Sequence, residues 1–287
     1  MWRVARRIPL GREELPVLLT TTSEAALDSI TTSREEASLA LGRTSLGVVE
    51  AGPDLSWSIS GIPMASFNAV LHCRLGPDPD RQIDAVLRHF AERAMPLVWW
   101  VQGADDDLER RLRDHGLEYY GHESPGMAVA LTSASLLRGR QPSAPVHRVT
   151  EPMALRTWFA TLLESFEVTP SEETLELASN VFAQLSGDVA SGWRFYLARI
   201  EGRPVGTSAL HLGNAAGLYS VGTLPSVRRQ GIGTALSVRA LLDARSAGYR
   251  IASLTASDLG TRLYGALGFK EYCRYREYVW RPRVVRP

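Results

Sequence analysis

The chain has 287 residues, of which 45% are hydrophobic and 22% are charged, and its formal net charge is +1. Those proportions exclude a disordered or fibrous chain, and the nearly balanced charge argues against a nucleic-acid binder that depends on a large basic surface. The length allows two domains of ordinary size.

The two cysteines, Cys73 and Cys273, lie far apart, and neither belongs to a cluster with metal-ligand spacing. We therefore expect no bound metal and a reducing compartment. The amino-terminal stretch is positively charged, but no apolar core region or cleavage site follows it, and no run of about 18 apolar residues occurs. The sequence predicts a cytoplasmic protein without a membrane or nucleic-acid partner, as a monomer or a homodimer.

The first half alternates between helical and extended patterns. The helix expected over residues 80–93 has Ile83, Val86, Leu87 and Phe90 on one face. In chain order we expect mixed helical material over 12–41, strands over 47–50, 55–60 and 67–75, the helix over 80–93, a strand over 97–101, a helix over 105–115, and two strands between 117 and 131.

Residues 132–145 contain two prolines and no periodicity, which predicts a linker between a domain over 1–131 and a domain over 146–287. Beyond the linker we expect a strand over 146–149, helices over 152–167 and 171–184, and a hairpin over 193–212. An apolar run that ends at Pro225 predicts the next strand, and a helix over 231–247, a strand over 251–255, a helix over 258–267 and a strand over 269–280 follow.

The stretch from Tyr219 to Leu236 has the order strand, turn and helix start, which suits an anion. The first turn of a helix has N–H groups without intrahelical partners and the positive end of the macrodipole. Gly231 and Gly233 let the backbone approach a diphosphate closely, and a guanidinium of Arg228 or Arg229 can hold a phosphate through two parallel hydrogen bonds. The alternative is a tight turn whose arginines lie in solvent.

The order Pro225, then Arg228, Gly231 and Gly233, resembles the acyl-CoA loop of the GNAT acetyltransferases. The resemblance implies that acetyl-CoA is the co-substrate and that main-chain groups of the preceding strand hold its pantetheine arm and polarise the thioester. The residues it assigns to acetyl-CoA are Val221, Gly222, Thr223, Arg228, Arg229, Gln230, Gly231, Ile232, Gly233, Thr234 and Ser257.

A second segment, Leu263 to Phe269, resembles another signature of the same family, a helix along the CoA groove and a glycine turn into a strand. By this resemblance Tyr264 is the acid that protonates the departing thiolate, and a phenol with a pKa of about 10 keeps its proton at neutral pH. The alternative is a tyrosine that only packs its ring on the groove. Ser257 stands where family members often have Asn, and Gly260 replaces a small aliphatic residue, which predicts altered contacts to the pantetheine.

The two halves can be aligned on their helix-glycine-strand segments, which predicts two copies of one unit. The family resemblance implies an α/β (α+β) fold of two GNAT-like domains, each a mixed, mostly antiparallel twisted sheet flanked by helices. The first copy has Pro77, Asp78, Pro79 and Asp80 in place of the phosphate loop and Leu112 in place of Tyr264, so we expect it to be degenerate and not to bind CoA in this way. Two unrelated domains with similar endings are the alternative.

The function implied is acetyl-CoA-dependent transfer of an acetyl group to a primary amine of a small molecule, by direct attack in a ternary complex. A protein or peptide acceptor, and a non-catalytic acyl-CoA-binding regulatory module, are the alternatives. The sequence does not identify the base: Glu164, Glu167 and His211 are candidates, and a solvated side chain suits each of them. An acceptor pocket can draw on Trp158, Phe159 and Phe166, or on the stretch 57–68, although core packing explains most of these residues.

Overall fold

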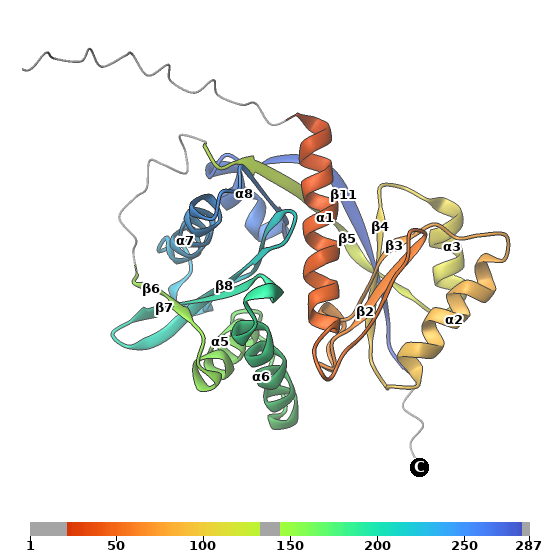
Figure 1. Ribbon diagram of the computed structural model, residues 1–287, viewed down its shortest axis with the longest axis horizontal. Coiled ribbons are helices and arrows are strands. Elements are labelled where there is room, and N and C mark those ends of the chain that lie inside the picture. The colour runs from red at the N-terminus through yellow and green to blue at the C-terminus, as the bar shows by residue number, and fades with distance from the viewer. Residues whose placement is uncertain (1–21, 133–143, 283–287) are drawn as a thin grey trace, which may run out of the picture.

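The structure, a computed structural model, describes residues 22–132 and 144–282 (Figure 1). The predicted linker lies outside the described residues except at its two ends, as does the start of the first helical stretch. The α-helices are α1 (Ser23–Gly42), α2 (Pro79–Ala91), α3 (Asp106–Asp114), α5 (Pro152–Ser165), α6 (Glu172–Gly187), α7 (Ile232–Ser246) and α8 (Asp258–Ala266). The strands are β1 (Val48–Ala51), β2 (Leu55–Ile59), β3 (Ala69–Cys73), β4 (Leu97–Gln102), β5 (Glu118–Ala130), β6 (Val146–Val149), β7 (Trp193–Ile200), β8 (Arg203–Leu212), β9 (Ala216–Thr223), β10 (Ile251–Thr255) and β11 (Lys270–Trp280).

All of these strands belong to one sheet. Its order is β1-β2-β3-β4-β11-β5-β10-β9-β8-β7-β6, and helices cover both faces. The predicted mixed α/β class with helices flanking a sheet is confirmed, and the strands of the two halves are joined edge to edge. No helix in the part of the chain that the structure describes is long and apolar enough to cross a membrane.

The centre of the sheet is built by an exchange of strands between the halves. The last strand, β11, lies between β4 and β5, so that Tyr275 pairs with Gln102 on one side and with Ser124 on the other. Strand β5 in turn separates β11 from β10. Outward from the β11–β5 pair the order is symmetric, with a parallel pair β3–β4 on one side and a parallel pair β9–β10 on the other. That symmetry supports a repeat, and the degenerate character of the first copy stays a prediction.

The prediction of two strands between residues 117 and 131 is wrong, because β5 is one long strand. It is paired along both edges, and Gly126 faces Cys273 on β11 and Thr255 on β10. A side chain at residue 126 would collide with the sulfur of Cys273, so the glycine is needed for this close approach and makes no turn.

Alternating side chains place the helices on two faces. Trp99 packs in the apolar cluster under α2 and α3, whereas the next residue, Trp100, packs toward α1. Met127 likewise joins the cluster under α7 and α8, and Ala128 faces α1. Helices α2, α3, α7 and α8 therefore cover one face, while α1, α5 and α6 cover the other.

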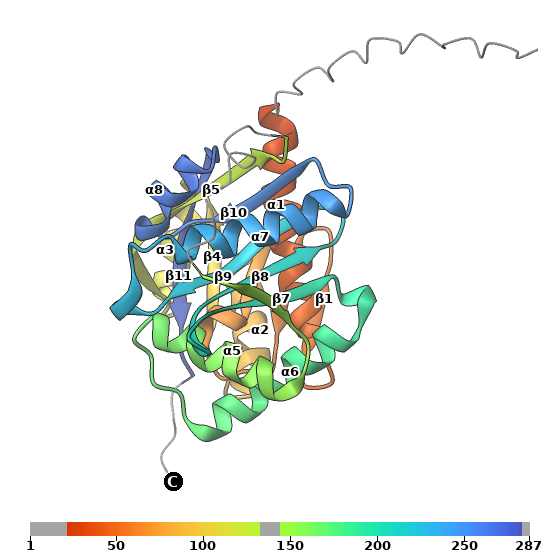
Figure 2. The same ribbon diagram turned by 90° about the vertical axis from the view of Figure 1, so that its left-hand side faces the viewer.

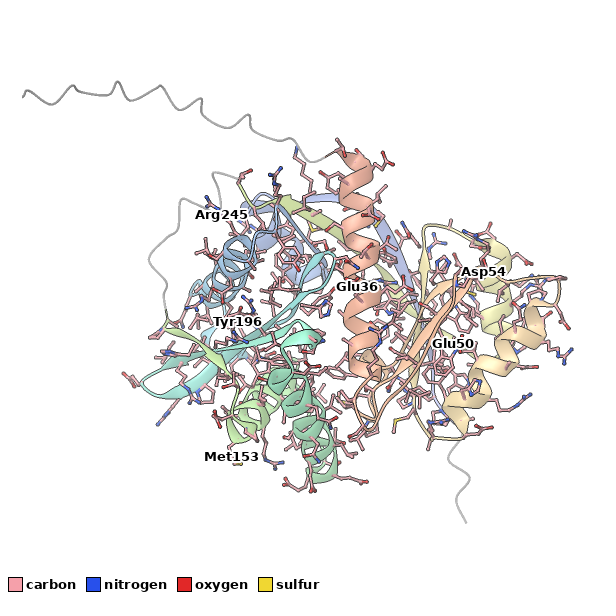
Figure 3. All side chains as sticks on the ribbon, in the orientation of Figure 1. Glu36, Glu50, Asp54, Met153, Tyr196 and Arg245 are labelled. Carbon is pink, nitrogen blue, oxygen red and sulfur yellow. The ribbon has the colours of Figure 1, made fainter. Side chains whose placement is uncertain are left out.

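Helix α1 crosses the middle of the sheet and contacts strands of both halves (Figures 1 and 2). Its inner side carries small residues, of which Ser29 and Ser33 meet Ser253 of β10. The Ser33 and Ser253 hydroxyl oxygens lie 2.8 Å apart, and the Ser253 hydroxyl donates to the Ser29 carbonyl at 3.0 Å. Farther along, Glu36 accepts from the Asn214 backbone at 2.8 Å, where α1 faces the β8–β9 turn (Figure 3). The first helix is thereby fixed to the second half.

The stretch 57–68 also connects the halves. Trp57 is buried in the core of the first half, whereas Phe67 contacts Phe159 on α5 with ring centroids 5.6 Å apart. The turn between them is held by the fully buried Asn68, whose side-chain amide donates to the carbonyls of Ile62 at 2.8 Å and Met64 at 3.0 Å. These residues pack the first half against α5 and α6, which is the plainer of the two roles expected for them.

Candidate active site

Each half of the sheet opens at its parallel pair of strands. In the first half, β3 and β4 pair only at Ala69–Val98 and Val70–Trp99 and then separate, and we call the opening between residues 71–73 and 100–102 the first notch. In the second half, β9 and β10 pair only at Ala216–Ala252 and Gly217–Ser253, and the opening between residues 218–223 and 254–255 is the second notch. Main-chain groups that a ladder would use along these edges are left for other partners.

A β-bulge shapes the second notch. Thr207 pairs with Gly222 and Ala209 with Tyr219, so β9 has one more residue than β8 across this interval. Ser220 takes up the extra residue with a φ of 52°, and the Thr207 hydroxyl donates to its carbonyl at 2.9 Å. The bulge re-aims the backbone at Val221 and Gly222, two of the predicted acetyl-CoA residues. Sequence reasoning missed Ser220, since serine gives no signal of a left-handed backbone.

Gly222 is buried against the end of α5. A Cβ at this position would overlap the Ser165 side chain, so only glycine lets α5 approach the bulged strand. On the other face, Val221 packs against the cluster under α7. The strand that borders the second notch is therefore held from both sides.

The strand leads into a helix start without a capping side chain. Pro225–Val227 forms one 3-10 turn, Arg229 has a φ of 63°, and Gly231 is the N-cap of α7 with a φ of 83°. No side chain caps α7, and its first turn contains no acidic residue. The N–H groups at Ile232, Gly233 and Thr234 thus form the positive end of a helix dipole without a counter-charge from that turn. This arrangement suits a diphosphate.

The two arginines of this loop differ in their contacts. Arg228 donates to the Ser165 carbonyl at 2.7 Å and to the Thr223 carbonyl at 3.3 Å, and it lies 3.5 Å from Glu167. It fastens the loop to α5. Arg229 and Gln230 are exposed, and Arg229 has no ion pair among the described residues. Of the two arginines predicted to contact phosphate, Arg229 is therefore the more available to a ligand.

Tyr264 lies on α8 in the same apolar cluster as Leu218 of β9 and Leu254 of β10. Its side chain is 8% exposed, and its ring packs edge-to-face on Phe269 at 5.6 Å. Burial raises the pKa of Tyr264, because the phenolate would lose its hydration. A Cβ at Gly260 would stand 2.8 Å from the tyrosine ring, which explains the glycine where an aliphatic residue was expected.

Ser257 begins α8 as its N-cap, but its side chain makes no capping hydrogen bond. The residue is exposed, so its hydroxyl is free to bind a ligand. Gly233, in the first turn of α7, lies where a Cβ would stand 3.1 Å from Leu263 of α8. The missing side chain lets α7 and α8 approach, and the two predicted signatures meet at this point.

The remaining candidates lie elsewhere. Trp158 and Phe159 are core residues, whereas Phe166 is 57% exposed. His211 is buried at the end of β8 opposite Gly217, away from the bulge, and burial lowers its pKa to about 4, so it is neutral at pH 7. Burial raises the pKa of the Cys73 thiol to about 12, which argues against an acyl-cysteine there. The described residues contain no group of three or more His, Cys, Asp or Glu side chains that could hold a metal ion.

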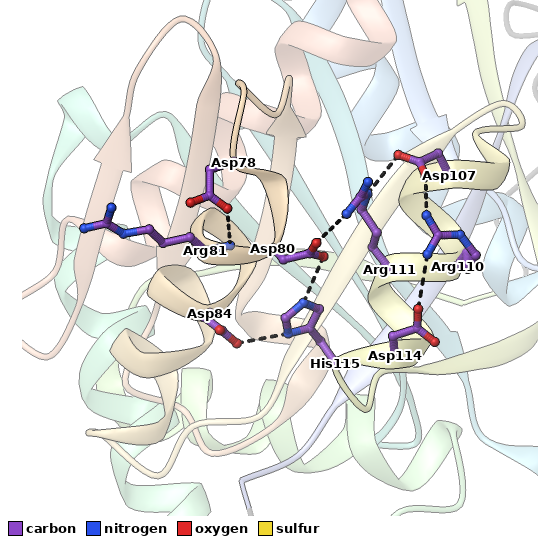
Figure 4. A network of polar contacts seen from close by, with 9 residues as sticks. All are labelled: Asp78, Asp80, Arg81, Asp84, Asp107, Arg110, Arg111, Asp114 and His115. Carbon is purple, nitrogen blue, oxygen red and sulfur yellow. Dashed lines mark hydrogen bonds and ion pairs between the residues drawn. The ribbon is translucent and has the colours of Figure 1, made fainter.

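Helix α2, which follows the first notch, has acidic residues at its start, in contrast to α7. Asp78 caps α2 by accepting from the Arg81 backbone at 3.3 Å, and Pro79 removes one donor at the helix start. Asp80 in the first turn pairs with Arg111 of α3 at 2.5 Å and with His115 at 3.3 Å (Figure 4). Carboxylates thus occupy the place that a diphosphate would need.

Comparisons with known proteins agree with this geometry. Residues 191–271 match the sequence family described as Acetyltransferase (GNAT) domain. No curated protein matches the chain. Among solved structures, a GCN5-related N-acetyltransferase from Kribbella flavida aligns with a TM-score of 0.60 at 18% identity, over 87% of this chain and 93% of that one.

Two further structures have the same fold. A tandem GNAT protein from the clavulanic acid biosynthesis pathway aligns with a TM-score of 0.56 at 14% identity, over 85% of this chain and 87% of that one. A GCN5-related N-acetyltransferase from Sphaerobacter thermophilus aligns with a TM-score of 0.53 at 16% identity, over 90% and 94%. Residues 191–271 are therefore an acetyltransferase domain of the GNAT type, and the chain as a whole has the fold of the GNAT structures with which it aligns.

Proposed function

We propose that the second notch binds acetyl-CoA and transfers its acetyl group to the primary amine of a small molecule by direct attack. The observation that carries the proposal is the continuous path from the bulged edge of β9 to the uncapped start of α7, with the buried Tyr264 in the cluster beside it. A diphosphate on the N–H groups at 231–234, close to Arg229, places the rest of the molecule along the strand.

Main-chain groups at Val221 to Thr223 then face the thioester. An N–H aimed at the carbonyl oxygen stabilises the oxyanion that forms when the amine attacks. Tyr264 supplies the proton to the departing thiolate, and its raised pKa keeps the hydroxyl protonated until that step. No covalent enzyme intermediate is needed.

We infer that the acceptor is a small molecule because α1 covers the face of the sheet opposite α7 and α8. This helix comes from the first half, lies over β9 and β10, and is fixed there by the contacts of Ser29 and Ser33 with Ser253. A folded protein has little room to approach a strand that is covered in this way. A compact amine needs only a channel beside the helix.

The test is a thiol-release assay with purified protein, acetyl-CoA and two panels, one of small amines and one of peptides with free amino termini. We expect thiol release with at least one small amine and none with the peptides. The rate should rise from pH 7 to pH 9, because an amine with a pKa of about 10.4 is mostly protonated at neutral pH. Turnover of peptides alone would overturn the acceptor class, and tight CoA binding with no turnover on either panel would favour a regulatory module.

A further inference from the structure

The first notch encloses a cavity that the acetyl-transfer reaction does not use. Where β3 and β4 separate, a space of about 150 Å³ lies between α1 on one face and the start of α3 on the other. Leu71, Val101 and Leu108 give it apolar walls, and Arg34 from α1 and Tyr275 from β11 also line it.

Arg34 is a buried cation without a counter-charge in contact. Its residue is 9% exposed, and its guanidinium carbon lies 4.3 Å from the centre of the Trp100 ring and 3.9 Å from that of Tyr275. One terminal nitrogen, Nη2, donates to the Leu71 carbonyl at 3.5 Å, and the other, Nη1, has no hydrogen-bond partner. Within the described residues no carboxylate lies within ion-pair distance of Arg34.

Such a residue is unusual in a protein interior. A buried charge is costly unless it is paired, and the faces of two aromatic rings offset only part of that cost. The Nη1 atom, which lacks a partner, belongs to a residue that lines the cavity. An anion that reaches Nη1 from this space would supply an acceptor and a counter-charge together.

The cavity selects among anions by shape, size and charge. A planar carboxylate can pair with a guanidinium through two parallel hydrogen bonds. The volume holds about five groups the size of a water molecule, since each takes about 30 Å³ in the liquid. Glu35 and Asp105 also line the space and disfavour a second negative charge on the ligand, whereas the Cys73 thiol is neutral.

We propose that the first notch binds a short monocarboxylate, with its carboxylate on Arg34 and its aliphatic part against Leu71, Val101 and Leu108. The site is distinct from the acetyl-CoA notch. The ladder pairing makes β3 and β9 run in opposite directions, so the two notches open toward opposite ends of the sheet. The proposal stands whether or not the second notch transfers acetyl groups.

The first experiment compares propionate with propionamide by titration calorimetry on the full chain. The two ligands have nearly the same size and differ in charge, so the comparison isolates the anion. We expect a Kd for propionate on the order of 1 mM, and propionamide and inorganic phosphate each to bind at least about tenfold more weakly. Equal binding of propionate and propionamide, or phosphate binding as tight as propionate, would overturn the proposal.

The second experiment locates the site. Arg34→Met keeps an unbranched, although shorter, side chain and removes the charge, and it should weaken propionate binding at least about tenfold. Arg43→Met, on the exposed end of the same helix, is the matched control and should bind propionate as the unaltered chain does. Both variants should bind CoA normally. Full propionate affinity in Arg34→Met would rule out the assignment, and if that variant does not fold, the propionate and propionamide pair still decides.

Discussion

The two notches have the same strand geometry, but the helix starts that follow them differ in charge. Both begin where a parallel pair ends after two residues on each strand. The second notch leads to a helix start with a glycine N-cap and no acid, whereas the first leads to a start capped by Asp78 and followed by Asp80. A buried arginine of α1 lines the first notch. The fold supplies an opening in the sheet, and a few residues at its edge decide what charge it accepts.

The largest effect should come from separating the two notches. Residues 144–282 alone would lose β4 and β5, which pair with both edges of β11. We expect this fragment to be insoluble or to lack a cooperative thermal transition, because it exposes long unpaired strand edges. Co-expression with residues 22–132 should restore a soluble complex that elutes as one species. A fragment that folds and binds CoA by itself would show that the second notch is independent of the first.

Tyr264→Phe tests whether the second notch carries a proton donor that the first lacks. Removing a general acid should lower the turnover rate about 10²- to 10⁴-fold, while the Kd for acetyl-CoA changes less than about threefold. The control is Tyr249→Phe, whose hydroxyl donates to the Gly213 carbonyl away from the notch. Because burial raises the pKa of Tyr264, no fall in rate below about pH 10 should come from this residue. Unchanged turnover would reduce Tyr264 to a packing role.

Thr234→Glu places an acidic residue at the helix start beside the second notch, as Asp80 stands at the helix start after the first. The new carboxylate lies in the first turn of α7, as Asp80 does in α2. It should weaken acetyl-CoA binding about 100-fold by repelling the diphosphate, and it should leave the melting temperature unchanged or raised, because an acid favours a helix start. Thr234→Gln separates size from charge and should bind nearly normally. Equal binding by both variants would exclude the helix start as the phosphate site.

A titration to acid pH should lower the stability of the fold through a residue that belongs to neither notch. His211 lies outside both, and its pKa is lowered by burial from 6.5 to about 4. The unfolded chain therefore binds the proton more readily, so this stability is present above about pH 6.5 and is lost as the pH falls toward 4. Between pH 6.5 and 5 the free energy of unfolding should fall by about 2 kcal/mol from this group. Denaturant titrations should show that this part of the slope disappears in His211→Gln and persists in His147→Gln.

The smallest effect distinguishes the two arginines of the second notch. Arg229→Ala should raise the Kd for CoA about tenfold with little change in melting temperature, since its side chain is exposed. Arg228→Ala should mainly lower the melting temperature, because it loses its bond to the Ser165 carbonyl. Calorimetry and thermal unfolding of both variants measure the contrast. A larger loss of CoA affinity in Arg228→Ala would mean that this contact opens when the ligand binds.

Local patterns predicted most elements, because they depend on neighbouring residues. The strand over 251–255 agrees at both ends, and the loop after Thr223 does turn into a helix start at Gly231. The prediction that failed depends on contacts between residues far apart in the sequence. The long strand β5 was divided in two, since nothing in its own residues shows that β10 and β11 pair along both edges.

Parts of the candidate site also could not be predicted from the sequence. Ser220 accommodates the bulge without glycine, and Arg228 turns to α5 because the end of that helix happens to lie beside the loop. Arg34 was not singled out, since one arginine on a modestly amphipathic helix resembles any exposed one. Its burial follows from α1 crossing the centre of the sheet, which depends on both halves at once.

The exchange of strands also sets the order in which the molecule can be completed during synthesis. Strand β4 meets its inner neighbour only when Lys270–Trp280 has been translated, although β4 itself ends at Gln102. The inner edge of β4 must therefore stay without its native partner on the ribosome for more than half of the chain, and both edges of β5 also wait for strands of the second half. Folding of this protein is therefore completed late, and the final segment closes both halves in a single step.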